Sequence, residues 1–578
     1  MCALPTAARF RLAEVQPVEV RVTGPHRRPL RDPLMWAGLV LIALGAALPH
    51  GALADAVVAA GGPAGLESGF RLLRIVAAAT GVLLAGAAYG NVGHSGIGVV
   101  RPTAPAPIHW SVTDAIALST LVVLAIGVRV PALNAQYWLD EMFTVMDFVR
   151  PPFVAIVTSF ESQNNHPLYS LLANALVSVF GESPWVLRLP AVLFGVAGVA
   201  ALYWFAIQVT SRTEAVLSAA LLTVSYHHVW FSQNARAYTA LLCFALVGTG
   251  LFLRLCREQS TGLRSTALAY AAVMTLAVYS HMTAALIVAA HFAVWVIAVA
   301  VRGRWRDAWR TAPALAVAVA GSFSLVLYAP GLGHIASGLG GAGEQVEMVW
   351  KNPLWMLVET ARGLARGVPG GVPTLAIAAI APVAGVISFA RRDRVLTALM
   401  LAPAVLTAAM LVATRHNLWP RFFFFAAGFA IVITVRGVFA LAARQKWVPA
   451  RPAAVTVTAA VIAASAALLP AAWGAKQDFT SALTYVQNAR APGDVVAVTG
   501  IADWVYHDFY PTDWTSVKDA SSLRELASAE GRTWLVHVMP ELIAARTPEL
   551  WSEMQAFEEI TTFRGTLAGG TVHIGVSR

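Results

Sequence analysis

Long apolar blocks recur along most of the chain. A stretch of roughly 17–25 apolar residues is long enough to cross the hydrocarbon core of a membrane as a helix. Blocks of this kind lie near residues 34–50, 71–90, 112–133, 186–207, 215–231, 237–253, 266–281, 284–301, 312–330, 372–390, 395–414, 421–441 and 453–473. The pattern predicts an α-helical polytopic membrane protein with about thirteen transmembrane helices.

The pattern changes after Trp473. Segments 493–500, 533–539 and 571–578 have the composition of short strands. Between them, residues 521–531 and 548–560 have the spacing of amphipathic helices. The alternation predicts a small α/β domain over residues 474–578.

Charged residues are scarce and occur in short clusters. Only 12% of the 578 residues are charged and 57% are hydrophobic, whereas soluble proteins carry about 25% charged residues. The formal net charge of +10 is compatible with a nucleic-acid partner. The basic residues, however, lie mostly between apolar blocks, as membrane topology requires, so we expect no nucleic-acid binding.

The basic clusters also predict an orientation, because cytoplasmic loops of membrane proteins are rich in Lys and Arg. With thirteen spans and a cytoplasmic N-terminus, the basic segments at 254–264, 302–310, 391–394 and 444–451 all fall on the cytoplasmic side. The Ala- and Arg-rich composition suits a bacterial inner (plasma) membrane, and the endoplasmic reticulum membrane stays an open alternative. The expected parts are a cytoplasmic arm (1–33), two extra membrane helices (34–111), a main transmembrane domain (112–473) with a first external loop at 134–185, and an external, periplasmic domain (474–578).

Two adjacent carboxylates, Asp140 and Glu141, follow an apolar run at the start of the first external loop. They could be solvated loop residues, but the surrounding aromatic and aliphatic side chains favour partial burial. Burial would raise at least one carboxyl pKa and suit that group to general-base work. The three cysteines, Cys2, Cys243 and Cys256, lack metal-ligand spacing, and we infer neither a disulfide nor a metal site from them.

Further polar residues are expected at the external ends of other spans. Arg188, at the mouth of one span, is interpreted as an arginine that snorkels to the headgroups. Arg421, which opens a late span, could anchor the interface or hold a phosphate through its guanidinium fork. Charge near a membrane is costly and usually partnered. The same face is expected to carry His166, Arg236, Tyr238, His281 and Arg415.

The motifs "YWLDE", "NNHPLY", "RLPAVLFG", "SQNARAYTALL" and "PRFFFF", in this order, resemble those of polyprenol-phosphate-sugar glycosyltransferases with the GT-C fold. The most similar groups are the bacterial relatives of dolichyl-phosphate-mannose protein mannosyltransferases and the lipid A aminoarabinose transferases. The resemblance covers roughly residues 112–440. It implies that Asp140 is the catalytic base, with Glu141 beside it, and that Arg421 binds the donor phosphate. The same resemblance, or position alone, assigns further residues to the site. Phosphate binding is assigned to Arg236 and Arg415, and pocket lining to Trp138, His166, Tyr238 and His281.

The implied reaction is one inverting displacement. A monosaccharide would move from a membrane-held polyprenyl phosphate to a hydroxyl or amine of a protein, lipid or glycan acceptor. The sequence assigns no definite cofactor, and a divalent metal near Asp140 and Glu141 stays an open alternative, because two carboxylates without a clear third ligand do not demand one. Two rival functions also stay open. A transporter or flippase would place ionisable residues in mid-span, and a ligase moving whole glycans would use the long loop 331–371 for a large acceptor.

Overall fold

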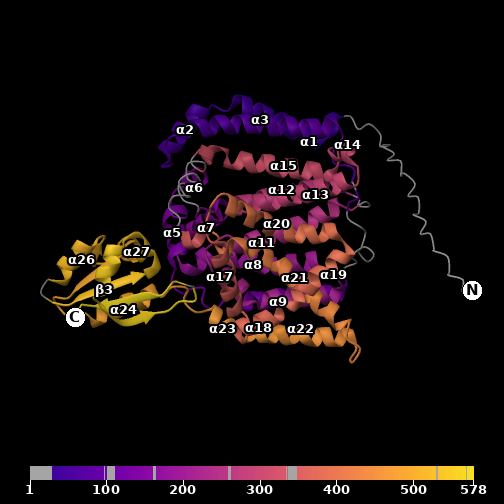
Figure 1. The fold of residues 1–578 in the computed structure, drawn as a ribbon. Coiled ribbons are helices and arrows are strands. Elements are labelled where there is room, and N and C mark those ends of the chain that lie inside the picture. The colour runs from indigo at the N-terminus through magenta and orange to yellow at the C-terminus, as the bar shows by residue number, and fades with distance from the viewer. Residues whose placement is uncertain are drawn as a thin grey trace, which may run out of the picture.

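The computed structural model of the 578-residue chain describes residues 29–96, 98–99, 111–160, 164–257, 262–333, 335, 348–528, 531–567 and 569–577. Most of the expected N-terminal arm, Cys2, and the central part of the loop 331–371 lie outside the described residues. The described chain forms a bundle of roughly parallel helices with a smaller sheet domain at one end (Figure 1).

The bundle is built from helices that follow the apolar blocks. They are α1 Pro33–Ala47, α2 His50–Ala59, α3 Glu67–Tyr89, α4 Val112–Gly127, α8 Pro184–Ala206, α9 Arg212–Thr223, α10 Tyr226–Ser232, α11 Tyr238–Leu255, α12 Leu263–Ser280, α13 Ala284–Val301, α15 Ala312–Tyr328, α18 Gly371–Ala378, α19 Ile380–Arg392, α20 Arg394–Ala413, η4 Pro420–Ala426, α21 Ala427–Ala442, α22 Ala450–Ala467 and α23 Leu469–Ala472. Shorter helices lie in the connections: α5 Leu139–Phe148, α6 Phe153–Thr158, α7 Pro167–Phe180, α14 Trp305–Ala308 and α17 Pro353–Arg366.

Each of the thirteen predicted spans overlaps at least one helix, but fewer of the described segments qualify as membrane spans. Nine helical segments of the described chain are long and apolar enough to cross a membrane, or ten if the bent pair α1–α2 counts as one span. The prediction of one continuous span over 215–231 is wrong, because α9 ends at Thr223 and α10 starts at Tyr226. The apolar pattern runs through this break, so hydropathy alone does not reveal it.

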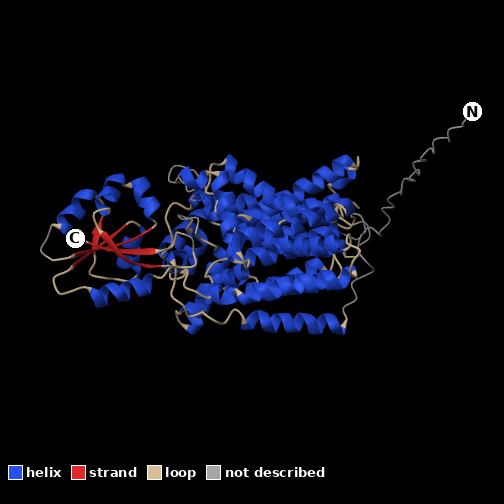
Figure 2. Ribbon diagram, turned by 60° about the horizontal axis from the view of Figure 1, so that its bottom comes forward, coloured by secondary structure: helices blue, strands red, loops and turns tan. Residues whose placement is uncertain are grey.

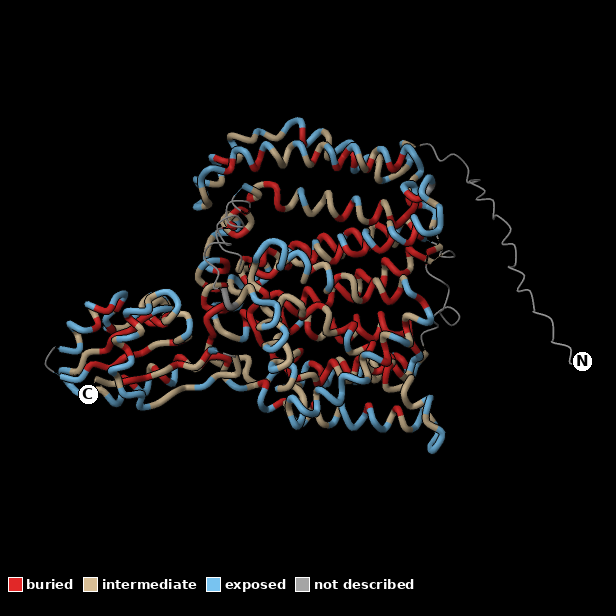
Figure 3. The backbone as a smooth tube through the Cα atoms, in the orientation of Figure 1, coloured by how far each residue is buried: buried red, intermediate tan, exposed pale blue. Residues whose placement is uncertain are grey.

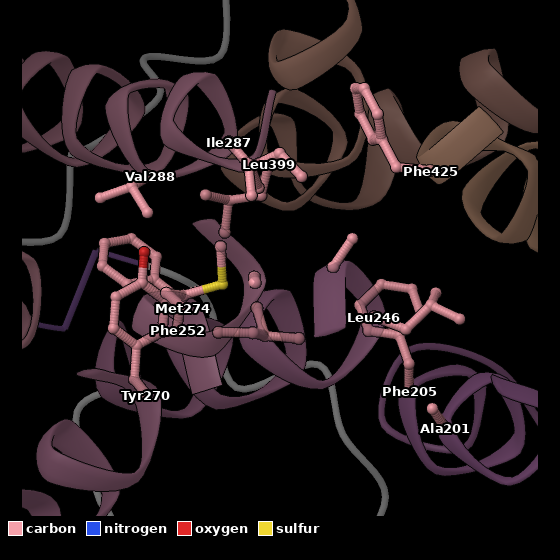
Figure 4. Packing of buried hydrophobic residues seen from close by; sticks show 14 of the residues in the cluster. Ala201, Phe205, Leu246, Phe252, Tyr270, Met274, Ile287, Val288, Leu399 and Phe425 are labelled. Carbon is pink, nitrogen blue, oxygen red and sulfur yellow. The ribbon is translucent and has the colours of Figure 1, made fainter. Parts of the chain in front are cut away.

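The core of the bundle lies among α8, α11, α12, α13, α20 and α21. Figure 4 shows Phe205 and Leu246 packed near Phe425, with Phe252, Met274 and Ile287 continuing the cluster. Figure 3 shows that buried residues concentrate in these central helices, whereas α1–α3 and α22 are more exposed. Cys243 and Cys256 are free, buried thiols.

The N-terminal helices α1 and α3, joined by α2, form a hairpin at the side of the bundle. α1 crosses α3 closely, and a Cβ on Gly38 would lie 2.5 Å from the Gly81 carbonyl oxygen. Small residues at such a crossing let helix backbones approach without a hydrophobic driving force from lipid. α1 and α2 are bent by 78° at the break between them.

The basic segments gather at one end of the bundle, called the basic end. Arg257 donates to the Gln208 carbonyl at 3.0 Å, Arg392 to that of Val209 at 3.4 Å, and Arg451 to the Thr213 hydroxyl at 2.8 Å. α14, in the basic segment after α13, also lies at the end of the bundle away from the sheet domain (Figure 1). The sheet domain marks the opposite end, called the domain end.

The C-terminal part is an α/β domain. Its elements are α24 Phe479–Ala489, β1 Val495–Thr499, α25 Ile501–Trp504, β2 Thr515–Val517, α26 Ala520–Ala527, β3 Thr533–Val538, α27 Pro540–Arg546, α28 Pro548–Met554, β4 Glu558–Phe563 and β5 Val572–Val576. The strands form one sheet in the order β2-β1-β3-β5-β4, parallel among the first three and antiparallel among the last three. Helices cover the sheet on both sides (Figure 2).

Three of these strands were predicted, and β2 and β4 were not. The predicted helix 548–560 is wrong at its end, because α28 stops at Met554 and β4 begins at Glu558. The run Ile560, Thr561 and Thr562 is β-branched, which favours a strand over a helix.

Candidate active site

Asp140 and Glu141 lie in the first turn of α5, at the domain end. Trp138 precedes the helix in an extended conformation, and its N–H donates to Glu141 Oε2 at 3.4 Å. This local cap fixes which way the first turn points its side chains. The two adjacent carboxylates consequently have different partners.

Asp140 meets two arginines from distant parts of the chain. Arg421 Nη1 lies 2.7 Å from Asp140 Oδ2, across 281 positions of sequence, and Arg236 Nη2 lies 3.9 Å from the same oxygen. The Asp140 carboxylate keeps 12% of its surface and Arg421 keeps 26%, so solvent or a ligand can reach both. One oxygen of Asp140 therefore lies beside two of the three arginines that the sequence predicts to bind phosphate.

Arg236 is held from a second side. It comes from the turn between α10 and α11, where residues 233–237 reverse the chain. Its Nη2 donates to Asn164 Oδ1 at 3.0 Å, and its Nη1 to Thr144 Oγ1 at 3.3 Å. These contacts fix the guanidinium plane between α5 and the segment that leads into α7.

A layer of rings adjoins the arginines. His166 stacks on His281 with ring centroids 4.8 Å apart, and Tyr238 lies 6.1 Å from His166 and 5.5 Å from His281. Burial, together with Arg236 and Arg421, lowers the pKa of His166 and lowers that of His281 to about 3. Both imidazoles are therefore neutral at ordinary pH, which leaves the positive charge of the site to the arginines.

Glu141 faces away from this group and is fully buried. Arg188 binds both of its oxygens, with Nε to Oε1 at 2.8 Å and Nη2 to Oε2 at 2.6 Å, and the Ala235 N–H adds a bond of 2.7 Å. Arg188 is itself 1% exposed, so its interpretation as a snorkelling arginine is wrong. Burial alone would raise the pKa of Glu141, but Arg188, Lys476 and the Ala235 N–H together outweigh burial, and the pKa is lowered. The expectation of a raised carboxyl pKa is therefore wrong for Glu141.

Replacing Glu141 with Gln should destabilise the fold, because Arg188 would stay buried without its counter-charge. Removing one partner of a buried ion pair costs about 3–5 kcal/mol. The measurement is thermal unfolding of the variant in detergent. The double variant Glu141→Gln, Arg188→Met should recover part of this loss, because it removes both charges. Unfolding at the wild-type temperature by the single variant would contradict the ion-pair role.

Lys476 is a site neighbour that the sequence did not reveal. It is 8% exposed, donates to the Gln233 carbonyl at 2.6 Å, and lies 5.2 Å from the Trp230 ring. Burial lowers its pKa to about 7, although the nearby Glu141 opposes the shift. The sole sequence signal is a lysine directly after the last apolar block, which is also where interfacial lysines occur.

Stability should depend on pH through Lys476. The folded-state pKa of about 7 lies below the ordinary value of 10.5, so the unfolded chain binds more protons between these values. Raising the pH within this window should stabilise the fold by about 1.4 kcal/mol per unit. The free energy of unfolding of the wild type and of Lys476→Met, measured at pH 7 and pH 9, tests this. Between these pH values the wild type should gain more stability than the variant. Parallel pH profiles would contradict the buried-amine assignment.

Two other predicted site residues lie apart from this group. Trp138 is buried, donates from Nε1 to Asn234 Oδ1 at 3.1 Å, and packs 6.0 Å from Trp230, so it links α5 to α10. Arg415 is exposed at the turn after α20 and has a positive φ of 51°. In the part of the chain that the structure describes, no group of three or more His, Cys, Asp and Glu side chains is arranged to hold a metal ion.

Residues 164–328 match the family model described as dolichyl-phosphate-mannose-protein mannosyltransferase. The matched segment contains His166, Arg236, Tyr238 and His281, whereas Asp140 and Arg421 lie on either side of it. No curated protein matches the sequence.

Solved structures with similar chains include ArnT from Cupriavidus metallidurans bound to undecaprenyl phosphate, at 13% identity and a TM-score of 0.47, with 81% of this chain and 98% of that chain covered. AglB from Archaeoglobus fulgidus, in complex with an inhibitory peptide and a dolichol-phosphate, is 12% identical at a TM-score of 0.48, covering 79% and 74%. EmbB from Mycobacterium smegmatis, an arabinosyltransferase, is 14% identical at a TM-score of 0.39, covering 71% and 44%.

The family match confirms the resemblance drawn from the motifs. The chain is a multi-pass membrane protein, and residues 164–328 are similar to a family of glycosyltransferases. The particular family that matches, over residues 164–328, is the dolichyl-phosphate-mannose-protein mannosyltransferase family.

Proposed function

We propose that this protein moves a monosaccharide from a polyprenyl-phosphate donor to a hydroxyl or amine acceptor, at the membrane face that carries the C-terminal domain. The observation that carries the proposal is the pairing of Asp140 with Arg421 and Arg236. A base and two cations meet there beside neutral histidines. Arg421 opens the candidate span Pro420–Ala442, which is the depth at which a lipid-linked phosphate would lie.

The face itself follows from charge. The basic segments gather at the basic end, and Lys and Arg favour the cytoplasmic side. The domain end would then be external, in a bacterial plasma membrane the periplasmic side. A donor presented there is a lipid phosphate rather than a soluble nucleotide sugar, because the sugar must cross the membrane on a lipid.

Donor binding would exchange partners at Arg421. Arg421 Nη1 lies 2.7 Å from Asp140 Oδ2 and neutralises its charge. A phosphate that accepts hydrogen bonds from Arg421 and Arg236 would release Asp140, whose carboxylate is then free to accept a proton. Phosphate binding and formation of the active base are thus one event in this mechanism.

The chemical step is a single displacement at the anomeric carbon. The acceptor oxygen or nitrogen forms the new bond to this carbon as the bond to the phosphate oxygen breaks, which inverts the configuration. Asp140 takes the acceptor proton, and the polyprenyl phosphate leaves with its charge stabilised by Arg421 and Arg236. His166, His281 and Tyr238 would line the sugar pocket as neutral groups.

The transporter alternative requires ionisable groups that serve a path through the spans. His291 is such a residue, buried within α13. However, its ring nitrogens pair with Thr249 Oγ1 at 3.1 Å and Tyr270 Oη at 3.0 Å, which is a satisfied packing contact. The bent pair α1–α2 lies in the peripheral hairpin. These observations favour the enzyme.

The decisive experiment supplies purified protein in detergent with polyprenyl-phosphate monosaccharides carrying a labelled sugar. Transfer of label to an extract of membrane lipids, glycans and proteins is the expected result. Parallel reactions with a polyprenyl-diphosphate oligosaccharide test the ligase alternative. Transfer only from the oligosaccharide donor would replace the monosaccharide assignment, and transfer from neither would direct attention to transport.

A further inference from the structure

The segment that joins the bundle to the C-terminal domain lies against the helix that carries the proposed base. Gln477 is fully buried, and its Oε1 accepts a hydrogen bond of 3.0 Å from the N–H of Leu139, the residue before Asp140. The first N–H groups of a helix have no partner within the helix. Gln477, which lies 338 positions from Leu139 in sequence, thus supplies a hydrogen-bond acceptor for one of these N–H groups from outside the helix.

A second pair of contacts fixes the same junction, this time through a side chain of the segment that precedes α5. Gln136 Nε2 donates to Asp478 Oδ1, and Gln136 Oε1 accepts from the N–H of Thr480 at 2.7 Å. Asp478 also caps α24, with Oδ1 accepting from the Ser481 N–H. The entry to α5 and the entry to α24 are therefore bonded to each other through side chains on both.

The packing continues this junction into one core. Leu139, Met142 and Val145 of α5 belong to the same buried cluster as Phe479 and Ala482 of α24. On the flank of α5, Phe143 stacks on Trp504 of α25 with centroids 4.1 Å apart. A cluster shared in this way means that α5 cannot shift along its axis without also disturbing the C-terminal domain.

Lys476, the residue before Gln477, makes a further contact between this segment and the bundle, near Glu141. Its ammonium group bonds the Gln233 carbonyl in the turn that leads to Arg236. Residues 476–480, called the strap, therefore touch both α5 and the turn before Arg236. Asp140 and Arg236 both depend on elements that the strap holds.

We propose that the strap is a positioning element, in which Gln477 above all holds α5 so that Asp140 stays in register with the arginines. This inference rests on the proposed function. It assigns the C-terminal domain a part in turnover, in addition to any part in acceptor binding. Gln477 would act through Asp140 and touch no substrate.

The test compares Gln477→Met, which keeps the size but loses the acceptor oxygen, with Gln477→Glu, which keeps an oxygen for the Leu139 N–H. Gln477 Nε2 has no partner among the described residues, so the Glu variant sacrifices no hydrogen bond. Because small misplacements of a reacting group can cost about a hundredfold, we expect Gln477→Met to lower kcat by about ten- to a hundredfold. The KM for the donor should stay within about threefold, and Gln477→Glu should recover most of kcat.

Arg524→Ala is the matched control, because it removes an exposed ion pair with Glu553 on a distant helix of the same domain. It should leave kcat and KM unchanged. Wild-type kcat in Gln477→Met would overturn the proposal. So would a loss of kcat that is equal in the Met and Glu variants, or a loss shared with Arg524→Ala.

A second readout separates this proposal from the proposed function. Hydrogen–deuterium exchange of the peptide spanning 137–148 should quicken in Gln477→Met, but not in Gln477→Glu or Arg524→Ala. If the wild type transfers no sugar, the proposed function fails while faster exchange still supports the strap. Unchanged exchange in Gln477→Met would overturn the strap whatever the activity.

Discussion

Replacing Asp140 with Asn is expected to lower sugar transfer by about 10²–10⁴-fold, the range that a positioned general base contributes. The amide cannot accept the acceptor's proton, yet its oxygen can still receive the hydrogen bond of Arg421. Donor binding should therefore change little, and the loss should fall on kcat. Initial rates with a labelled polyprenyl-phosphate monosaccharide measure this.

The control for Asp140→Asn is the same change at Asp513. Asp513 is largely exposed on the C-terminal domain and paired with Arg490. Its variant should transfer at the wild-type rate. Full transfer by a folded Asp140→Asn protein would remove Asp140 from the mechanism. The fold of each variant is checked by its thermal unfolding in the same detergent.

The sequence predicts well which residues gather at each end of this bundle, for a physical reason. Span length and Lys–Arg asymmetry are imposed by the membrane, which is the same for every protein. Counting spans was therefore enough to place Asp140 and Arg421 on one face, although they are 281 positions apart. The structure brings the two side chains to 2.7 Å.

The partners of Glu141 and the role of Arg188 could not be predicted in this way. An arginine near the start of a span satisfies the same pattern whether it turns outward to headgroups or inward to a carboxylate. Which way Arg188 turns depends on the path of residues 132–136, whose carbonyls also accept from it. That path is tertiary information. Lys476 and Gln477 are harder still, because their partners lie more than 240 positions away.

The missed strand β4 is a different case, because the sequence does contain a signal for a strand there. Residues 558–563 carry three consecutive β-branched side chains, and the predicted helix 548–560 runs on to the first of them, Ile560. The break within 215–231 had no such signal, since both α9 and α10 are compatible with one apolar stretch. Local propensity thus gives the type of an element more reliably than its end.

Replacing Arg421 with Gln is the second change expected to have a large effect. Removing one donor that stabilises developing negative charge commonly costs about 2.7–4 kcal/mol, or 10²–10³ in kcat. Arg421 also holds the phosphate of the bound donor in this mechanism, so the donor KM should rise as well. The guanidinium lies 5.1 Å from the Trp419 ring and 2.7 Å from Asp140, and glutamine keeps neither the charge nor the fork. Lysine restores the charge but not the fork, so Arg421→Lys should recover only part of the rate.

The comparison with Arg415 decides which arginine serves the phosphate. Arg415 precedes Arg421 by six positions and is exposed, so Arg415→Gln should keep kcat and donor KM within about twofold, as a surface charge outside the site does. A large loss in Arg415→Gln with a small one in Arg421→Gln would move the phosphate to Arg415. In that case Arg421 would serve only to neutralise Asp140, and its loss should lower kcat rather than raise the KM for the donor. Steady-state kinetics of both variants across pH 6–9 separate the two arrangements.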